Sequence, residues 1–323
     1  MEIPPKSSAE VPSTSEVGRN RSFKELLDET FREILYRAEH PDINHFMTGL
    51  ETDFYDLDYM TGGLKAGELI VLGGRPAMGT TSLALNLVMN VARLNSRPVV
   101  YVNMVLSRQA LVYRMLVAEA RVNAYRFKRG RLAEGDLPKV QAAIETLSAL
   151  PIVLEDVSTR SAAGLMEYLL AKKTSEGISP CLVVVDDIRG LASMEENNAD
   201  ELFAFCQVCR QLKNLAMQLD TVVIAISNLN VSLEERDDRR PWLRDLPASD
   251  FVVGLADQVW FLYRDEYYDH ETTERGLAEL SIARSRTGPV GTIKLRFDKD
   301  HARFDNLAVP DVPPDENTNQ GAE

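Results

Sequence analysis

The feature that most limits the fold is a regular alternation of two hydrophobic patterns from Glu68 onward. Short apolar runs typical of buried strands occur at residues 69–73, 99–104, 152–154, 182–186 and 222–227. Stretches with helical periodicity alternate with them, at residues 81–94, 107–122, 136–147, 162–174 and 200–219. Strands that alternate with helices form a mostly parallel sheet covered on both faces. The sequence therefore predicts an α/β fold.

The pattern changes after Asp257, where strand-like runs follow one another closely at residues 258–263, 277–284 and 292–297. This spacing leaves no room for long crossover helices, so we predict antiparallel strands at the edge of the sheet. We assign residues 48–308 to one α/β domain. Residues 1–21 and 309–323 are poor in apolar side chains, and we predict that both are disordered tails.

Residues 22–47 are predicted to form a helix followed by a linker. Ser22 and Glu25 have the spacing of a capping box, which marks a helix start. One face of this helix carries an apolar stripe at Leu27, Phe31, Ile34, Leu35 and Ala38. The stripe either packs on its own domain or docks on a neighbouring subunit, and the sequence leaves both alternatives open.

Charge and cysteine content exclude several classes of protein. The chain has 36 Lys and Arg against 49 Asp and Glu, a formal net charge of −13. Any phosphate-binding site must therefore depend on a local group of positive or hydrogen-bonding residues. Three cysteines do not make a disulfide framework. No apolar run approaches the roughly 18 residues of a membrane-spanning helix. We predict a soluble cytoplasmic protein without a membrane partner.

The run from Gly74 to Ser82 lies between a predicted strand and a predicted helix. A phosphate-binding loop occupies this position, because its backbone N–H groups and the helix N-terminus both face the anion. Gly74 and Gly79 match the spacing G-x-x-x-x-G-K-[ST], in which Thr81 is the hydroxyl that holds Mg²⁺, but Thr80 replaces the lysine. The alternative is a glycine-rich turn without a ligand. The predicted nucleotide-binding residues are Gly74, Arg75, Pro76, Ala77, Met78, Gly79, Thr80, Thr81 and Ser82.

A second element supports the phosphate loop. The apolar run at residues 182–186 ends in Asp186, which is the form of a Walker B strand whose carboxylate holds Mg²⁺. We therefore predict ATP and Mg²⁺ as ligands, with Thr81 and Asp186 as the metal-binding residues.

The wider sequence carries more specific motifs. In chain order it reads TGLETDFYDLDYMTGGLKAGELIVLGGRPAMGTTSLALN, SNLNVSLEERDDRRP, FLYRDE, RTGPVGTIKLRF and RFDN. Together these segments closely resemble the C-terminal RecA-like motor domain of the DnaB-type bacterial replicative DNA helicases, from Thr48 to Leu307. The resemblance implies a RecA-like P-loop core, ATP bound between the subunits of a hexameric ring, and movement along one strand of DNA.

The resemblance also assigns roles outside the loop. Asn228 occupies the position of the family's γ-phosphate sensor, with a shorter amide than the family's glutamine. Arg284 and Arg286 match a basic pair that reaches into the next subunit's site. The resemblance therefore implies that these three residues are catalytic, the arginines in trans.

Besides Asn228, four positions depart from the family. Thr80 replaces the lysine of the loop, and Val105 stands where the family has the glutamate that orients the attacking water. In the DNA-facing loop, Pro247 replaces an arginine and Asp250 a glycine. Pro247 has no N–H to offer a DNA phosphate, and Asp250 adds a repelling charge, so we expect weakened binding of single-stranded DNA.

The losses at the ATP site decide the predicted activity. A preorganised charge on the phosphates is worth about 10²–10³ in rate, and a group that orients the attacking water about 10²–10⁴. We predict a DNA replication-linked, ATP-binding relative of the replicative helicases that hydrolyses ATP poorly. It would act as a regulatory or ring-associated subunit, in a homomeric ring or one shared with an active helicase.

Two alternatives remain. One is an active helicase with a rearranged site, in which Lys65 or Arg75 replaces the lysine and Asp187 replaces the glutamate. The other is an interaction protein that keeps the fold and binds no nucleotide.

Overall fold

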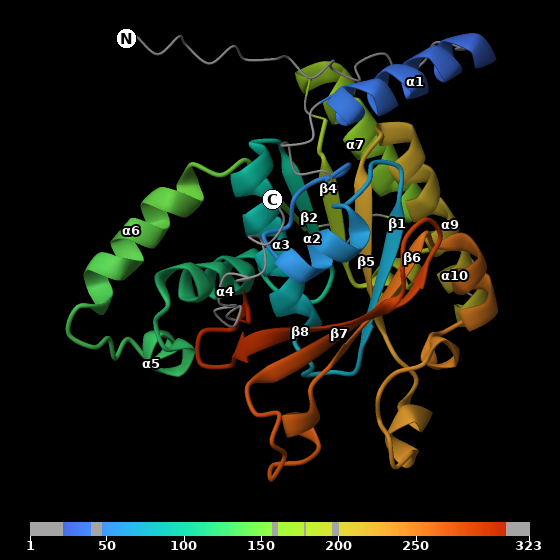
Figure 1. Ribbon diagram of the computed structural model, residues 1–323. Helices are drawn as coiled ribbons and strands as arrows, with labels where there is room; N and C mark the ends of the chain where they lie inside the picture. Colours follow the sequence, from blue (N-terminus) through green and yellow to red (C-terminus); the bar gives the residue numbers. More distant parts are fainter. Residues whose placement is uncertain (1–21, 40–46, 157–160, 178, 196–199, 308–323) are drawn as a thin grey trace, which may run out of the picture.

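A computed structural model describes residues 22–39, 47–156, 161–177, 179–195 and 200–307. The tails predicted at residues 1–21 and 309–323 lie outside these ranges. The described residues form a nine-stranded sheet in the order β3-β2-β4-β5-β1-β6-β7-β8-β9 (Figure 1). The strands are β1 (Leu69–Gly74), β2 (Val99–Asn103), β3 (Ile152–Asp156), β4 (Leu182–Asp186), β5 (Val222–Asn228), β6 (Gln258–Tyr263), β7 (Leu277–Ser285), β8 (Gly291–Asp298) and β9 (Arg303–Asn306).

The sheet is parallel from β3 to β6 and antiparallel from β6 to β9. The antiparallel edge is therefore confirmed for β7 and β8. For β6 that prediction was wrong, because β6 pairs with β1 in parallel, with Gln258 beside Ile70. The connection from β5 runs from Leu229 to Asp257 and includes a short helix, α10 (Ser249–Leu255), so the chain makes this crossover before the closely spaced strands begin.

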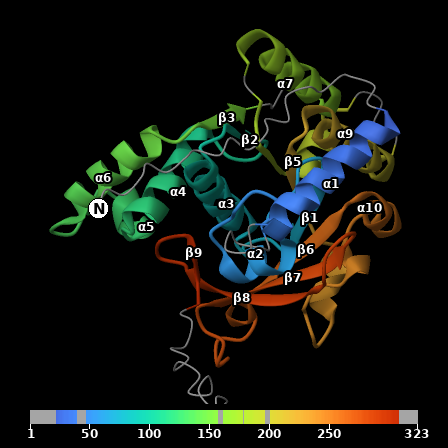
Figure 2. The same cartoon turned by 45° about the horizontal axis from the view of Figure 1, so that its top comes forward.

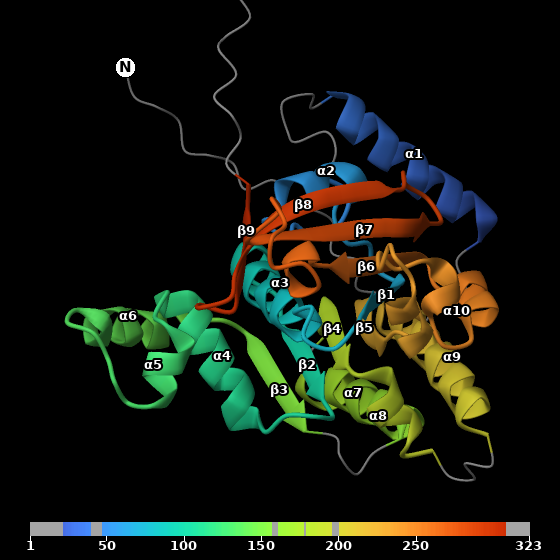
Figure 3. The same cartoon turned by 90° about the horizontal axis from the view of Figure 1, so that it is seen from below.

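Helices cover both faces of the sheet (Figure 3). Because the side chains of a strand alternate between faces, β1 contributes Ile70 and Leu72 to one core and Leu69 and Val71 to the other. The first core contains α2, α3 and α4, and the second contains α7 to α10. The helices are α2 (Tyr55–Thr61), α3 (Thr80–Asn95), α4 (Arg108–Ala120), α5 (Ala124–Lys128), α6 (Asp136–Ser148), α7 (Ala162–Glu176), α8 (Ile188–Ala192) and α9 (Glu201–Leu219).

The pairing register brings polar residues together at the carboxyl ends of four parallel strands. Gly74 of β1 is level with Asn228 of β5, and Asn103 of β2 is level with Asp186 of β4. Ligands of open α/β sheets bind beyond these strand ends. The fold therefore places the phosphate loop and Asp186 at the same edge of the sheet.

The N-terminal helix α1 (Phe23–Glu39) begins with the predicted capping box. The Ser22 backbone N–H donates to Glu25 Oε2 at 2.6 Å, and the Glu25 N–H donates to Ser22 Oγ at 3.3 Å. Figure 2 shows α1 running across the outside of the molecule. Its described apolar side chains are between 41% and 76% exposed: Phe23, Leu27, Phe31, Ile34 and Leu35. In the structure, these five side chains are therefore not buried against the α/β domain.

Within the described residues, no helix is long and apolar enough to cross a membrane.

Candidate functional site

The phosphate loop joins β1 to α3, as the spacing of its glycines predicts. Gly79 has φ +101°, a conformation that suits glycine and starts the helix at Thr80. A Cβ on Gly79 would lie 3.1 Å from the Phe304 ring, which packs against Phe297 beneath the loop. The first turn of α3 presents N–H groups that have no partner within the helix. The loop thus has the backbone geometry of an anion cradle.

Directly below this cradle, the predicted metal-binding side chains meet. The Thr81 hydroxyl donates to Asp186 Oδ2 at 2.7 Å. The Tyr101 hydroxyl donates to the same oxygen, also at 2.7 Å, from the interior of β2. Burial raises the pKa of the Asp186 carboxyl, and the hydrogen bonds from Tyr101 and Thr81 oppose this rise. A hydroxyl and a carboxylate under a phosphate loop form an oxygen donor set that suits Mg²⁺.

Tyr101 is a site residue that sequence reasoning missed. Its side chain is fully buried, and its pKa lies well above the ordinary value because burial and the Asp186 charge both oppose ionisation. The only signal in the sequence is a tyrosine within an otherwise aliphatic strand-like run. Tyr101 positions the carboxylate of Asp186 and remains a hydrogen-bond donor.

The neighbouring Asp187 and the predicted sensor Asn228 form a separate pair. Asn228 Nδ2 donates to Asp187 Oδ2 at 2.7 Å, while the backbone N–H of Gly190 donates to Asp187 Oδ1 at 2.8 Å. Asp187 is thereby the N-cap of α8, with both carboxylate oxygens engaged. This geometry describes a structural cap and not a base that faces a water molecule.

Neither cation suggested as a substitute for the loop lysine lies at the Thr80 position. Lys65 precedes the amino end of β1, whereas the loop follows its carboxyl end, about 20 Å away for a six-residue strand. Arg75 donates to Glu234 Oε1 and to the Leu229 carbonyl, each at 2.8 Å. Arg75 therefore fastens the loop to the segment after β5.

Val105, at the position of the family's glutamate, lies in the turn between β2 and α4. Its side chain is 67% exposed. The Asn103 side chain holds this turn, because its Oδ1 accepts hydrogen bonds from the N–H groups of Val105 and Leu106. The turn is ordered, but position 105 offers no group that can orient a water molecule.

The two arginines expected to act in trans lie away from this chain's own loop. The Arg286 guanidinium pairs with Asp257 at 3.1 Å, and Arg284 donates to the Ala256 carbonyl. Asp257 caps the amino end of β1 by accepting from the Leu69 N–H at 2.8 Å. Both arginines therefore lie near the opposite end of β1 from the phosphate loop, and the structure does not bring them together with Thr81 or Asp186.

The segment that corresponds to the DNA-facing loop is anchored at its start. Arg236 forms two hydrogen bonds to Asp245, at 3.0 and 2.9 Å. Pro247 is buried, and Asp250 is exposed in the first turn of α10. The two departures from the family therefore differ in exposure: Pro247 lies in the interior, and Asp250 presents its charge to solvent.

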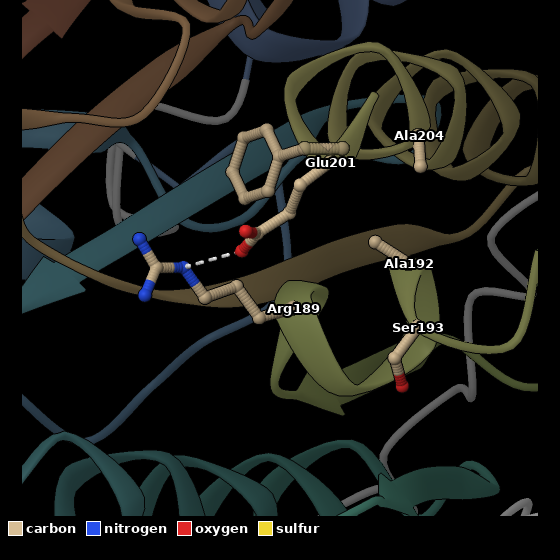
Figure 4. A pocket seen from close by; sticks show the side chains of 6 residues that line it. Arg189, Ala192, Ser193, Glu201 and Ala204 are labelled. Carbon is tan, nitrogen blue, oxygen red and sulfur yellow. Dashed lines mark ion pairs between the residues drawn. The ribbon is translucent and has the colours of Figure 1, made fainter. Parts of the chain in front are cut away.

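Two pockets contrast in size and chemistry. A cavity of about 850 Å³ adjoins the phosphate loop, and Thr80, Thr81 and Ser82 form part of its wall. A second pocket, of about 150 Å³, lies between α8 and α9, where Arg189 and Glu201 are 4.0 Å apart (Figure 4). The small pocket contains none of the predicted site residues, so the larger cavity is the candidate ligand site.

Comparison with known proteins is consistent with this geometry. Residues 49–306 match the family described as the DnaB-like helicase C terminal domain. The chain is 33% identical over 304 residues to a probable replicative DNA helicase of Trieres chinensis, and 34% identical over 303 residues to the replicative DNA helicase DnaB of Geobacillus stearothermophilus. These alignments cover 92% of this chain and 66% and 64% of the relatives, so the chain spans about two thirds of their length.

A solved structure agrees with the sequence matches. The chain superposes on the structure of a DnaB-like replicative helicase with a TM-score of 0.78 at 33% identity. That structure also concerns the interactions of that helicase with primase. The match covers 90% of this chain and 68% of that one. The RecA-like architecture expected from the sequence is therefore confirmed.

Proposed function

Because this chain belongs to the family of DnaB-like helicase C-terminal domains, we propose that it binds Mg-ATP at the phosphate loop and hydrolyses it poorly or not at all. The observation that carries the binding proposal is the contact of Thr81 with Asp186 beneath the backbone cradle. Bound Mg²⁺ would neutralise charge on the nucleotide phosphates. The chain itself supplies backbone N–H groups that would donate hydrogen bonds to phosphate oxygens, and Tyr101 keeps the carboxylate of Asp186 in place.

Two absent groups support the proposal of impaired hydrolysis. Thr80 carries no charge that could stabilise the transferred phosphoryl group, and Val105 cannot orient the attacking water. The engagement of Arg75 with Glu234 and of Asp187 with Asn228 argues against these two residues as replacements. The site thus keeps the groups proposed to bind nucleotide, and it lacks the lysine and the glutamate that promote hydrolysis.

Nucleotide binding and hydrolysis are tested separately. A ligand that binds only the folded chain raises its melting temperature, so millimolar Mg-ATP or Mg-ADP should shift the thermal transition upward. Phosphate release should stay at background with and without single-stranded DNA. The absence of any shift would favour a nucleotide-free interaction protein, whereas DNA-stimulated phosphate release would favour an active helicase.

We also propose that the chain takes part in a ring, either of its own copies or with an active replicative helicase. The exposed apolar stripe of α1 offers a docking surface, and Arg284 and Arg286 lie at the far end of β1 from the chain's own site. An arginine supplied in trans is worth about 10³–10⁵ in phosphoryl transfer. Such a subunit would complete the ATP site of a neighbouring subunit, while its own ATP site hydrolyses little or no ATP.

Mixing experiments test the ring proposal. Addition of the protein should change the ATPase rate of an active replicative helicase, and the double variant Arg284→Ala/Arg286→Ala should change it differently. Phe31→Asp, on the exposed stripe of α1, should weaken co-purification and leave the melting temperature unchanged, because Phe31 is 60% exposed. An unchanged ATPase rate together with no co-purification would refute the proposal.

Weakened binding of single-stranded DNA is the remaining part of the proposed function. Asp250 places a negative charge on the first turn of α10, where it repels phosphate, and Pro247 cannot donate a backbone hydrogen bond. The variant Asp250→Gly should therefore bind an oligonucleotide more tightly than the natural chain does. Equal affinity of the two proteins would remove Asp250 from the explanation.

A further inference from the structure

The large cavity beside the phosphate loop has two walls of different composition. One wall is the loop itself, with Gly79, Thr80, Thr81 and Ser82. The second wall is formed by α4, α5 and the turn between β8 and β9. A ligand in this cavity would be in contact with segments far apart in the sequence.

The cavity is positively charged although the chain carries a net charge of −13. Arg114, Lys128 and Lys299 line it, and its lining contains no acidic side chain. Among the described residues, none of these three cations forms an ion pair or a hydrogen bond with another side chain or with the backbone. A cluster of cations that form no ion pair in an acidic protein favours the binding of an anion, and the charge of Lys299 acts on a carboxylate, that of Glu266, only at longer range.

The three cations do not have equivalent positions. Arg114 acts on Asp186, since its charge lowers the pKa of that carboxyl against the effect of burial. Lys128 ends α5, and Lys299 follows β8 in the turn to β9. All three cations lie in the second wall, Arg114 on α4 and the two lysines on α5 and in the turn after β8.

That wall is held together by contacts across its two segments. The Ala124 N–H donates to the Asp300 carbonyl at 2.7 Å, which joins the start of α5 to the turn that carries Lys299. Arg121, at the end of α4, pairs with Asp305 of β9 at 2.9 Å. The positions of the two lysines are therefore fixed relative to each other by the fold and not by a bound ligand.

We propose that Lys128 and Lys299 bind the phosphate groups of a nucleoside di- or triphosphate from the second wall of the cavity, and so supply the charge that Thr80 does not. This inference rests on the proposed nucleotide binding and identifies how that binding survives without the loop lysine. An ammonium group is a point charge that does not require one bonding geometry, so two lysines can replace a third that approached from another direction.

The recognition that follows is for phosphate charge. Affinity should increase from AMP to ADP to ATP, because each added phosphate meets cations that form no ion pair within the cavity. It should also fall as ionic strength rises, since both lysines are solvent-exposed and their charges are screened by salt.

The experiment measures dissociation constants of AMP, ADP and ATP by calorimetry, with the full chain and with Lys128→Gln/Lys299→Gln. ATP should bind about tenfold more weakly to the double variant, a change that corresponds to about 1.4 kcal/mol. AMP should be affected least. Lys139→Gln is the matched control, because Lys139 is an exposed lysine of α6 outside the cavity lining. Thermal melts without nucleotide verify that each variant is folded.

A second background separates compensation from a general effect of charge. If the two lysines replace the missing lysine, the same double substitution should cost clearly less in a chain that also carries Thr80→Lys. Equal losses in both backgrounds, or no loss in the natural background, would overturn the inference while leaving nucleotide binding intact. If the unmodified chain binds neither ADP nor ATP, the proposed function itself fails.

Discussion

Restoration of the two missing groups should create ATP hydrolysis only when both are restored together. Thr80 is the first residue of α3. Its methyl group lies over Gly74, 2.5 Å from the position that a Cβ on Gly74 would take. The side chain of a lysine at position 80 would therefore begin within the phosphate loop. Val105 is 67% exposed, so a glutamate fits there without loss of packing. Each substitution should change stability by no more than about 0.5 kcal/mol.

The size of the effect follows from the two roles. The lysine is worth about 10²–10³ in rate, and a group that orients water about 10²–10⁴. A chain with only one of them therefore remains at least about 10²-fold below the doubly restored chain. Groups that act as a unit are not additive, so the first restoration alone should yield little.

The assay is steady-state phosphate release from Mg-ATP, with and without single-stranded DNA, for Thr80→Lys, Val105→Glu and the double variant. The matched control is Asp186→Asn in the double variant, which keeps both restored groups and removes the carboxylate that meets Thr81. Turnover in the unmodified chain, or in Thr80→Lys alone at the level of the double variant, would refute the reasoning.

Three further outcomes are expected. Gly79→Val should abolish the nucleotide-dependent thermal shift, because φ +101° disfavours a side chain and the new Cβ meets the Phe304 ring; a normal shift would contradict this account of the loop. Tyr101→Phe should lower the free energy of unfolding by about 1–3 kcal/mol, the worth of a buried hydrogen bond to a carboxylate, as measured by denaturant titration. Asp305→Asn should make stability less sensitive to acid. Burial opposes its ionised form, but the Arg303 hydrogen bond and the charges of Arg303 and Arg121 lower the pKa of Asp305 overall. Its stabilisation is thus complete above the ordinary aspartate pKa of about 3.9 and is lost as pH falls through the lower folded value. Melting curves between neutral and acidic pH compare the two proteins, and identical pH profiles would count against this contribution.

The sequence predicts the sheet well where strands are continuous apolar runs. Residues 182–186 and 258–263 are strands with the predicted bounds, because each run is buried throughout and is apolar except for the terminal residues Asp186 and Gln258. The parallel pairing of β6 was not predicted, since it depends on α10, a helix too short for a clear periodic signal. Periodicity also places Leu202 on the core face of α9, yet it is 52% exposed because it lies in the first turn of the helix, beyond the core.

The candidate site was predicted in part for a related reason. Glycine spacing and the end of β4 identify the loop, Thr81 and Asp186 from local sequence. The contact of Tyr101 with Asp186 joins residues 85 positions apart, and no local pattern reports it. Asp186 and Asp187 are identical in type and adjacent, so only the fold distinguishes the residue under the loop from the cap of α8.

The position of β1 has a consequence for synthesis of the chain on the ribosome. β1 pairs with β5 on one side and with β6 on the other, and β6 begins at Gln258. When residues up to Asn228 have emerged, the strands from β3 to β1 can assemble, but β1 is then an unpaired edge made of Leu69, Ile70, Val71 and Leu72. An exposed apolar edge strand invites pairing with other chains. Nascent chains that stall between these two points should therefore be the aggregation-prone species, and they should need a chaperone more than the finished protein does.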